Sequence, residues 1–385
     1  MMETKRMCEA MTLDEKRACC GRHAREAGFS IIELMVALAV MLIIIVPIFA
    51  LLRDALRTNT TAFEMADAQQ NMRTAQEYIT RDLIVAGDGL KTINNIMLPE
   101  AFVQQYLVRN TTLLARSPVN RNGTGSVVIP IITPDSASSS PTNPAGLLPG
   151  TDRITILSID PAFTPISLPA GAIVPSGANV SISTADVGRF QIGEIYMISS
   201  TYGATFGAIT NISPGSNPNL IFSSSDPYNL NDPGNGGSIA YVAYGPSGPG
   251  RGATSVPATL MRMRMINYFV NDRGQLIRRV FGVPRGVATD SGMGYADSII
   301  AENVTTLQFR YQLNLTDGSG QIRPPTAQPL GTTTPSEQGA IRQVETTVST
   351  RTQRFVPVGN GLRPEARSTT WTSVRNLQFR EALQP

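Results

Sequence analysis

The sequence predicts an α+β protein, in which one long N-terminal α-helix packs on a C-terminal antiparallel β-sheet domain with long loops. An apolar run from Leu34 to Leu52 contains no charge, amide or hydroxyl, which favours a membrane-inserted helix. The helical pattern continues, now amphipathic, to about Ala86. The chain also has 33 glycines and 27 prolines. With alternating apolar stretches after Gly87, these favour turns and strands for the remainder.

The apolar run is long enough for a membrane span. At about 1.5 Å per residue, a helix over residues 31–52 crosses a hydrocarbon core of roughly 30 Å. Pro47 lies inside it and removes one backbone donor, so we expect a kink or local melting there. The polar stretch Thr58–Thr61 is a second weak point, because its residues are poor helix formers. Gly87 is a plausible C′ residue at the helix end.

Glu33 is the anomaly of this segment, since it places an acid at the edge of the apolar run. An ionisable group at the centre of a membrane helix costs about 2.5–3.5 kcal/mol, and less near an end. A plain anchor has no use for it. The acid therefore requires a partner or a position at the headgroups.

The residues around Glu33 resemble the class III signal of type IV prepilins: a polar leader ends in Gly28, and Glu33 is the fifth residue from Phe29. The resemblance implies cleavage between Gly28 and Phe29 by a prepilin peptidase, and N-methylation of Phe29. It also implies that Glu33 faces the Phe29 amine of a neighbouring subunit and sets the assembly register. The alternatives are an ordinary signal anchor and a Glu33 that snorkels to the headgroups.

The implied organisation has three parts. Residues 1–28 form a cleaved leader, residues 29–87 the pilin helix, and residues 88–385 a periplasmic β-rich domain. Arg22 and Arg25 precede the apolar run and favour a cytoplasmic N-terminus in a single-pass inner-membrane protein. The resemblance implies a later extracellular location in the pilus. Met1 and Met11 both remain possible starts.

The positions of the cysteines and of the histidine limit the chemistry. Cys8, Cys19, Cys20 and the single histidine, His23, all precede Gly28. A chain cut there has no disulfide, thiolate, histidine ligand or Ser-His-Asp triad. The formal charge of +3 is too weak to indicate nucleic acid. We therefore expect no cofactor, no metal site and no enzymatic activity.

Alternation and turn residues predict the strands of the C-terminal domain. A hairpin is expected from Met261–Asn271 and Gln275–Phe281 around the turn 272–274. A short helix is expected within 98–115. The other expected strands are 127–132, 153–159, 191–199, 238–244, 304–315, 340–351 and 369–380. The segments 117–150 and 201–258 are expected to be largely long loops.

Several stretches resemble the PilW-type minor pilins and the related J-type minor pseudopilins of type II secretion. The stretches are 72–87, 150–156, 268–279, 302–311 and 369–377. The resemblance implies a minor pilin that primes type IV pilus assembly, with a place at the tip and a role in twitching motility. Its partners would be other minor pilins, the major pilin, the prepilin peptidase and inner-membrane lipid. A type II secretion pseudopilin and a tip adhesin, binding through loops 117–150 and 201–258, remain alternatives.

Four further features have an ordinary structural interpretation. We interpret Arg81 and Asp82 as a solvated helix face with a bridge to the β domain. The segment 229–237 near Asp226 has the composition of a Ca²⁺ loop but lacks its ligand spacing. The glycine-rich 245–252 lacks the Lys-Ser/Thr of a phosphate loop. The aromatic residues Tyr228, Tyr241, Tyr244 and Trp371 are interpreted as packing residues rather than an adhesive face.

Overall fold

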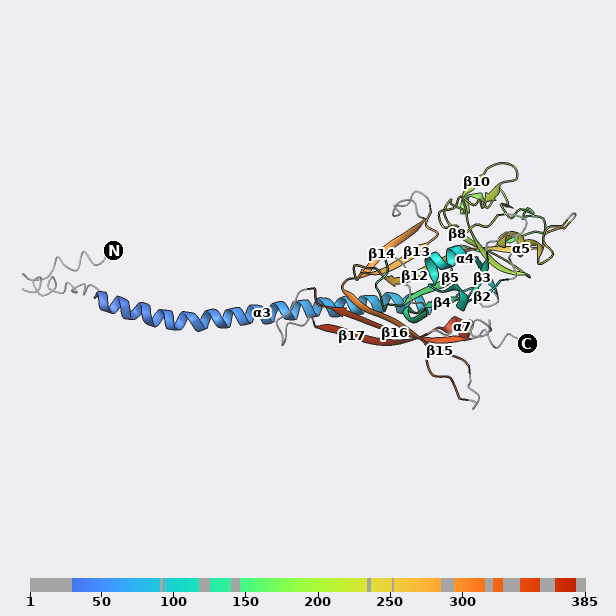
Figure 1. Cartoon of the computed structure of the whole chain (residues 1–385). Helices are drawn as coiled ribbons and strands as arrows, with labels where there is room; N and C mark the ends of the chain where they lie inside the picture. Colours follow the sequence, from blue (N-terminus) through green and yellow to red (C-terminus); the bar gives the residue numbers. More distant parts are fainter. Residues whose placement is uncertain are drawn as a thin grey trace, which may run out of the picture. The chain divides into compact units, whose positions relative to one another are not determined.

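The computed structural model (Figure 1) describes residues 30–90, 93, 95–117, 125–139, 146–233, 237–250, 253–284, 294–315, 321–327, 340–353 and 364–378. Its chain divides into two compact units, with the boundary between Thr61 and Ala62. The long N-terminal helix contributes to both units. The second unit holds every strand.

Helix α3 spans Ile31–Ile84, 54 residues, which confirms the predicted long helix to within two residues at each end. It passes through Pro47 as a continuous α-helix, so local melting is not observed there and the kink stays a prediction. It also continues through Thr58–Thr61, where threonine hydroxyls bond back to the carbonyls of Asp54 and Arg57. The helix ends before Gly87, whose φ of 75° is the left-handed conformation that glycine adopts most easily.

The largest sheet has 11 strands, and its main path runs β14-β13-β12-β8-β9-β1-β3-β2. Strands β4, β5 and β6 join it through β5 and β12. The pairs are antiparallel except β1 with β9, which is parallel. The strands are β1 Ile96–Pro99, β2 Ala115–Arg116, β3 Ser126–Ile129, β4 Ile132–Asp135, β5 Arg153–Ile159, β6 Ile166–Leu168, β8 Ile195–Ser200, β9 Gly203–Ala208, β12 Ala258–Val270, β13 Leu276–Phe281 and β14 Tyr295–Ala301.

Two three-stranded sheets and several short helices complete the described part of the second unit. One sheet has the order β15-β16-β17, with β15 Val304–Leu313, β16 Ile341–Arg351 and β17 Glu365–Ser373. The other has the order β10-β11-β7, with β7 Asn179–Ser181, β10 Asn211–Ser213 and β11 Asn219–Ile221. The helical segments are α4 Glu100–Phe102, η1 Val103–Leu107, η2 Thr111–Leu113, η3 Ala137–Ser139, η4 Val187–Arg189, α5 Ser238–Tyr244 and α7 Arg375–Gln378.

The β12–β13 hairpin confirms the strongest local prediction. Met265 pairs with Phe281 and Val270 with Leu276. Its turn is closed because the Asn271 side-chain oxygen accepts the N–H groups of Arg273 and Gln275. The same hairpin lies next to the helix and, as described below, supplies its main polar contact.

Two hydrophobic cores stabilise the second unit. The larger core joins Ala75, Ile79 and Leu83 of α3 to strands of the 11-stranded sheet and to β15 and β16. A separate cluster contains Val180 of β7, Tyr196 of β8 and other residues from β11, α5 and β12. Burial of apolar surface at about 25 cal/mol per Å² is the main stabilising term for both.

Two sequence predictions for the region 201–258 are wrong. Ser238–Tyr244 is helix α5, not a strand. Five of its seven residues are buried and the other two are half-buried. A short apolar run without a clear period does not distinguish a buried helix from a strand. The expected long loop also contains β9, β10 and β11. Strands β10 and β11 have only three residues each. Strands this short show no clear alternation within a turn-rich sequence, so the sequence did not predict them.

Other boundaries differ by smaller amounts. The expected strand 127–132 is two strands, β3 and β4, separated at Pro130 and Ile131. The short helix within 98–115 is confirmed only as α4 and η1, because Leu98 belongs to β1. The last strand begins at Glu365 and ends at Ser373, and α7 follows it. Strand β5 has the predicted bounds.

Candidate functional site

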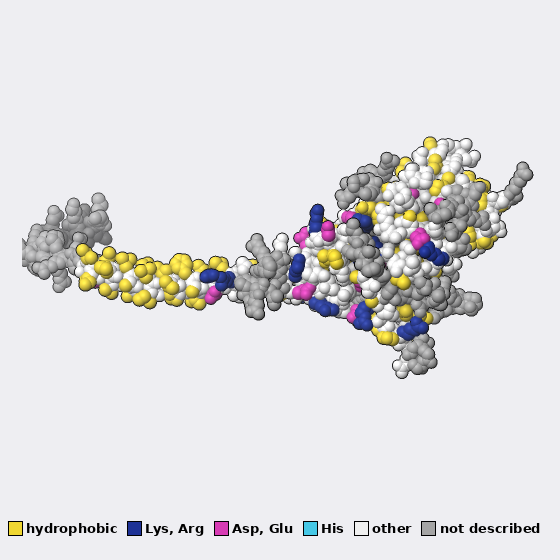
Figure 2. Space-filling model, viewed as in Figure 1, with side chains coloured by type: hydrophobic (Ala, Val, Ile, Leu, Met, Phe, Trp, Pro, Cys, Tyr) yellow, Lys and Arg dark blue, Asp and Glu magenta, His cyan; other side chains and the backbone are white. Residues whose placement is uncertain are grey.

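The first half of α3 exposes apolar side chains on all sides. Figure 2 shows this part of the helix as an almost continuous apolar surface. Ile31 is 81% exposed and Leu51 is 70% exposed, and the helix is long and apolar enough to cross a membrane. Water is a poor environment for such a surface, since each exposed Å² forgoes about 25 cal/mol of burial. Lipid or neighbouring apolar helices would cover it.

Charged residues mark the end of this apolar surface. Arg53, Asp54 and Arg57 follow Leu52 directly and are all exposed. Figure 2 shows basic and acidic side chains at the end of the apolar surface. Long basic side chains at this position extend toward headgroups or water. The polar boundary therefore agrees with the span expected at 31–52.

The structure places two of the four predicted site residues. Glu33 lies in the first turn of α3, where the helix dipole favours a negative charge. It is exposed and has no ion-pair partner within the described part of the chain. Pro47 lies inside the helix. Gly28 and Phe29 lie outside the described residues.

The second half of α3 is anchored to the β structure through Asp82. Its carboxylate accepts a hydrogen bond from the Tyr268 hydroxyl at 2.6 Å and from Arg278 Nε at 2.7 Å. Asp82 is 4% exposed and Tyr268 is fully buried. Arg81, its neighbour, is exposed and stacks over the Tyr78 ring at 4.7 Å. The interpretation of a solvated face with a bridge to the β domain is therefore confirmed, with Asp82 as the bridging residue.

Electrostatics keep Tyr268 and Arg278 in their donor forms beside Asp82. Burial raises the pKa of Tyr268, and the negative charge of Asp82 raises it further, so the hydroxyl remains a donor. Burial lowers the pKa of Arg278, but its hydrogen bond and charge interaction with Asp82 outweigh that effect and the net pKa is raised. Both partners of Asp82 therefore stay donors across the physiological pH range.

Further contacts attach the helix along its length. The Thr350 hydroxyl of β16 donates to the Ala68 carbonyl at 2.6 Å. The backbone N–H of Gln353 donates to Glu64 at 3.1 Å. At the helix end, the Asn376 side chain donates to the Ala86 carbonyl at 3.3 Å. The last two strands and α7 thus hold residues 64–86 of the helix against the sheets.

We expect Asp82→Asn to lower the free energy of unfolding of the second unit by about 3 kcal/mol, because it leaves a largely buried guanidinium without its counter-charge. Denaturant unfolding followed by the fluorescence of Trp371, the single tryptophan, measures this. The matched control is Glu77→Gln, which makes the same carboxylate-to-amide change at an exposed position of the same helix, and for which we expect a change within about 0.5 kcal/mol. Equal effects of both variants would contradict the anchoring role of Asp82.

The other candidate sites are structural within the described residues. The Asp226 carboxylate accepts the backbone N–H groups of Tyr228, Leu230 and Asn231, so its loop uses it internally. No group of three or more His, Cys, Asp or Glu suited to a metal is found among the residues that the structure describes. Tyr228 is fully buried, as interpreted from the sequence, whereas Trp371 is 46% exposed.

Comparison with known families decides the nature of the N-terminus. Residues 23–49 match the prokaryotic N-terminal methylation motif. The N-terminal segment is prepilin-like. This match implies processing by a prepilin peptidase and assembly with other pilins, and with the apolar helix it fits membrane anchoring. Pilin-type proteins are in general structural rather than enzymatic. No curated protein and no solved structure matches the chain.

Proposed function

We propose that this prepilin-like chain is a PilW-type minor pilin that takes part in the initiation of type IV pilus assembly. It is cut between Gly28 and Phe29, N-methylated at Phe29, and held in the inner membrane by residues 31–52 with its β-rich domain in the periplasm. The observation that supports the prepilin part of the proposal is the methylation motif at 23–49, which overlaps a helix with its apolar side chains exposed. The PilW-type part rests on the sequence resemblance alone.

Assembly is a packing process in this proposal. Helices from several subunits bundle and cover the surface that α3 exposes. Glu33, which lacks an ion-pair partner within the described chain, pairs with the methylated amine of a neighbour's Phe29, which stays cationic. In a low dielectric these two charges are costly apart and tolerable together. Pairing therefore fixes the axial register of one helix against the next, while the anchored second half of α3 transmits that register to the β sheets.

The alternative of a type II secretion pseudopilin shares the motif and the exposed helix. In a type IV pilus the helix would pack beside pilins, and in a type II secretion system it would pack beside pseudopilins. We expect the affinity-tagged protein, extracted in a neutral detergent and cross-linked in the membrane, to co-purify with the major and minor pilins. Recovery of secretion pseudopilins instead would overturn the pilus assignment and leave the prepilin assignment intact.

The adhesin alternative is supported by one observation. The segment 201–258, expected as a loop, holds β9, β10, β11 and α5, and its apolar residues join a cluster shared with β7, β8 and β12. This cluster is distinct from the core that packs on α3, and such a region suits the display of a surface. Deletion of the gene separates the two roles: loss of pili supports initiation, whereas normal piliation with loss of attachment to a surface supports adhesion.

A further inference from the structure

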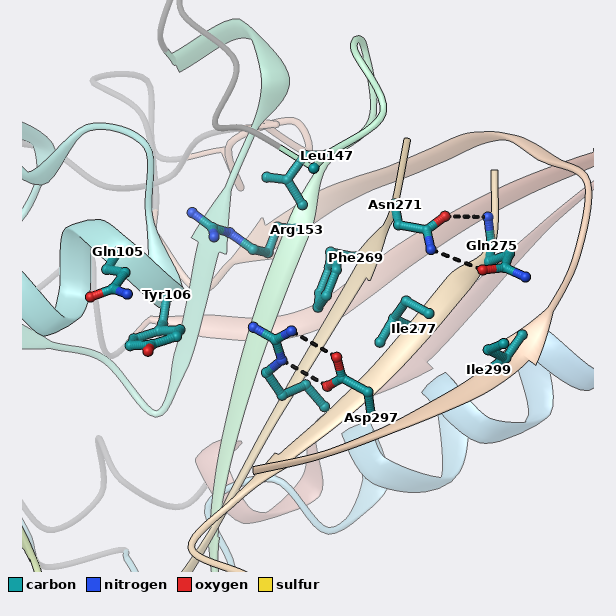
Figure 3. A pocket seen from close by; sticks show the side chains of 12 residues that line it. Gln105, Tyr106, Leu147, Arg153, Phe269, Asn271, Gln275, Ile277, Asp297 and Ile299 are labelled. Carbon is teal, nitrogen blue, oxygen red and sulfur yellow. Dashed lines mark hydrogen bonds and ion pairs between the residues drawn. The ribbon is translucent and has the colours of Figure 1, made fainter. Parts of the chain in front are cut away.

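A cavity of about 450 Å³ lies between η1 and strands β5, β12, β13 and β14 (Figure 3). Figure 3 shows Gln105 and Tyr106 at one end and Asp297 in its wall, and Arg279, the ion-pair partner of Asp297, also lines it. Arg153 and Phe269 also line it. The volume falls within the range of about 300–1,000 Å³ that small-molecule sites occupy. Neither the prepilin motif nor the helix contacts use this cavity.

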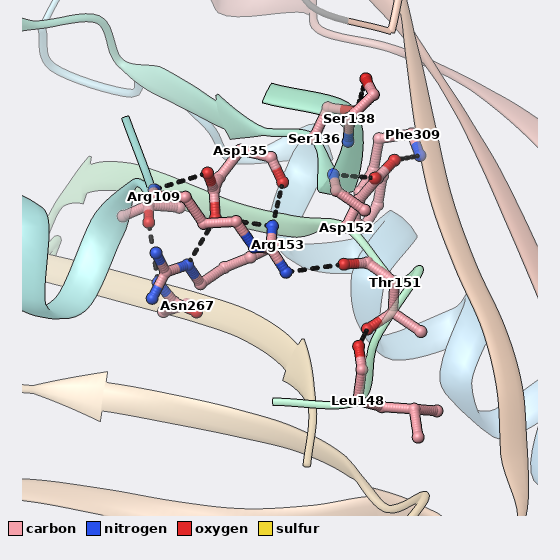
Figure 4. A network of polar contacts seen from close by, with 12 residues as sticks. Arg109, Asp135, Ser136, Ser138, Leu148, Thr151, Asp152, Arg153, Asn267 and Phe309 are labelled. Carbon is pink, nitrogen blue, oxygen red and sulfur yellow. Dashed lines mark hydrogen bonds and ion pairs between the residues drawn. The ribbon is translucent and has the colours of Figure 1, made fainter. Parts of the chain in front are cut away.

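Arg153 carries a buried donor that the protein leaves unused. Its side chain is 5% exposed, and Nε donates to Asp135 Oδ2 at 3.0 Å. The same carboxylate accepts Nη1 of Arg109 at 2.9 Å, so two guanidinium groups share it (Figure 4). Nη2 of Arg153 has no hydrogen-bond partner among the described residues. Buried donors are nearly always paired, so this atom indicates a missing acceptor.

Arg279 presents a second guanidinium to the same cavity. Its Nε and Nη2 form a two-point pair with Asp297, both at 2.7 Å. The group lies 3.8 Å from the Tyr295 ring centroid and 5.0 Å from that of Phe269, which holds it in one orientation. Nη1 takes no part in the pair with Asp297. A planar guanidinium fixed in this way is suited to a second acceptor.

Among the described residues that line the cavity, Arg153 and Arg279 carry a positive charge and Asp297 carries a negative charge. Asp135, shared by Arg109 and Arg153, lies behind this lining. The pKa of Arg153 is lowered, mainly by burial. The charge of Asp135 raises this pKa in part, whereas the positive charges of Arg109 and Arg279 lower it further. Burial also raises the pKa of nearby Asp152, although the backbone N–H groups of Ala137 and Phe309 bond to it. An anion placed between Arg153 and Arg279 would give both guanidinium groups a further acceptor.

We propose that this cavity binds a small molecule through a carboxylate group, which accepts hydrogen bonds from Arg153 and Arg279. A carboxylate matches the planar donors of guanidinium, and the volume of about 450 Å³ suits a ligand of about the size of a monosaccharide or a dipeptide. Two sources share this chemistry: a uronic acid and the C-terminus of a peptide. The proposal is independent of whether the chain assembles in a pilus or in a secretion filament.

The test uses the full mature chain in a neutral detergent and isothermal titration calorimetry. The probes are D-glucuronate, with D-glucose as its neutral control, and acetyl-dialanine, with its C-terminal amide as control. Gln105 and Gln104 are adjacent and both exposed, but only Gln105 lines the cavity. Gln105→Glu adds a negative charge that repels the ligand or occupies its place, and Gln104→Glu is the matched control.

We expect at least one carboxylate to bind, and its neutral control to bind about tenfold more weakly or not at all. Gln105→Glu should weaken binding about tenfold, and Gln104→Glu less than twofold. Preference for glucuronate or for the peptide identifies the source. The proposal is overturned if neither carboxylate binds at about 10 mM, if the neutral controls bind equally, or if both variants weaken binding alike.

Discussion

Replacement of Gly28 by valine is expected to abolish processing, so that the protein accumulates as a membrane-inserted precursor. By the prepilin resemblance, the peptidase accepts only a glycine-sized residue before the cut. The sequence supplies a direct readout, because the three cysteines all precede Gly28. A thiol-reactive dye under denaturing conditions labels the precursor and leaves the mature chain unlabelled. N-terminal sequencing of the wild-type mature chain should begin at methylated Phe29.

The control for this variant is Gly21→Val, which makes the same change outside the matched motif at 23–49. It should be processed like the wild type. The readout is unaffected by whether translation starts at Met1 or Met11, since Cys19 and Cys20 remain in either precursor. A mature chain that begins anywhere other than Phe29, or a processed Gly28→Val, would contradict the prepilin assignment of the junction.

The long helix and the β12–β13 hairpin could be predicted because each shows a strong local pattern. Helix α3 combines an apolar run with a terminating Gly87, and the β12–β13 hairpin has a turn built on Asn271 and Gly274. Short elements in polar, turn-rich sequence were missed. Strands such as β10 and β11 owe their existence to pairing with each other and with β7, and local propensity is a weak guide to such pairing.

The polar contacts were predicted only in part. A bridge from Asp82 to the β domain was expected, but its partners were not, because Tyr268 and Arg278 lie 186 and 196 residues further along the chain. Arg153 begins a strand that its alternating pattern predicted. The pattern did not show that six of the seven residues of this strand are buried. Pairing partners and burial on a second face depend on tertiary packing, which a single sequence does not display.

Replacement of Glu33 by valine or glutamine is expected to prevent incorporation of the subunit while leaving cleavage intact. Valine makes the segment more apolar, so insertion should be equal or better. The peptidase reads the Gly28 junction, so the chain should still lose its cysteines. In the assembled bundle, however, the Phe29 amine of the neighbour would be buried without a counter-charge, at a cost of several kcal/mol. Recovery of other pilins with the tagged variant should therefore fall at least about tenfold.

Asp54→Asn is the matched control, because it removes a carboxylate from the same helix beyond the apolar run. It should be cleaved and recovered with the other pilins at close to wild-type yield. A minor subunit is present in few copies, so the Glu33 variants in a strain without the wild-type gene should give fewer pili rather than altered ones. Redundant minor pilins could restore the pilus count, and co-purification is therefore the deciding measurement. If Glu33→Val is cleaved, inserted and recovered with its partners at wild-type yield, Glu33 is a snorkelling residue and the register mechanism is wrong.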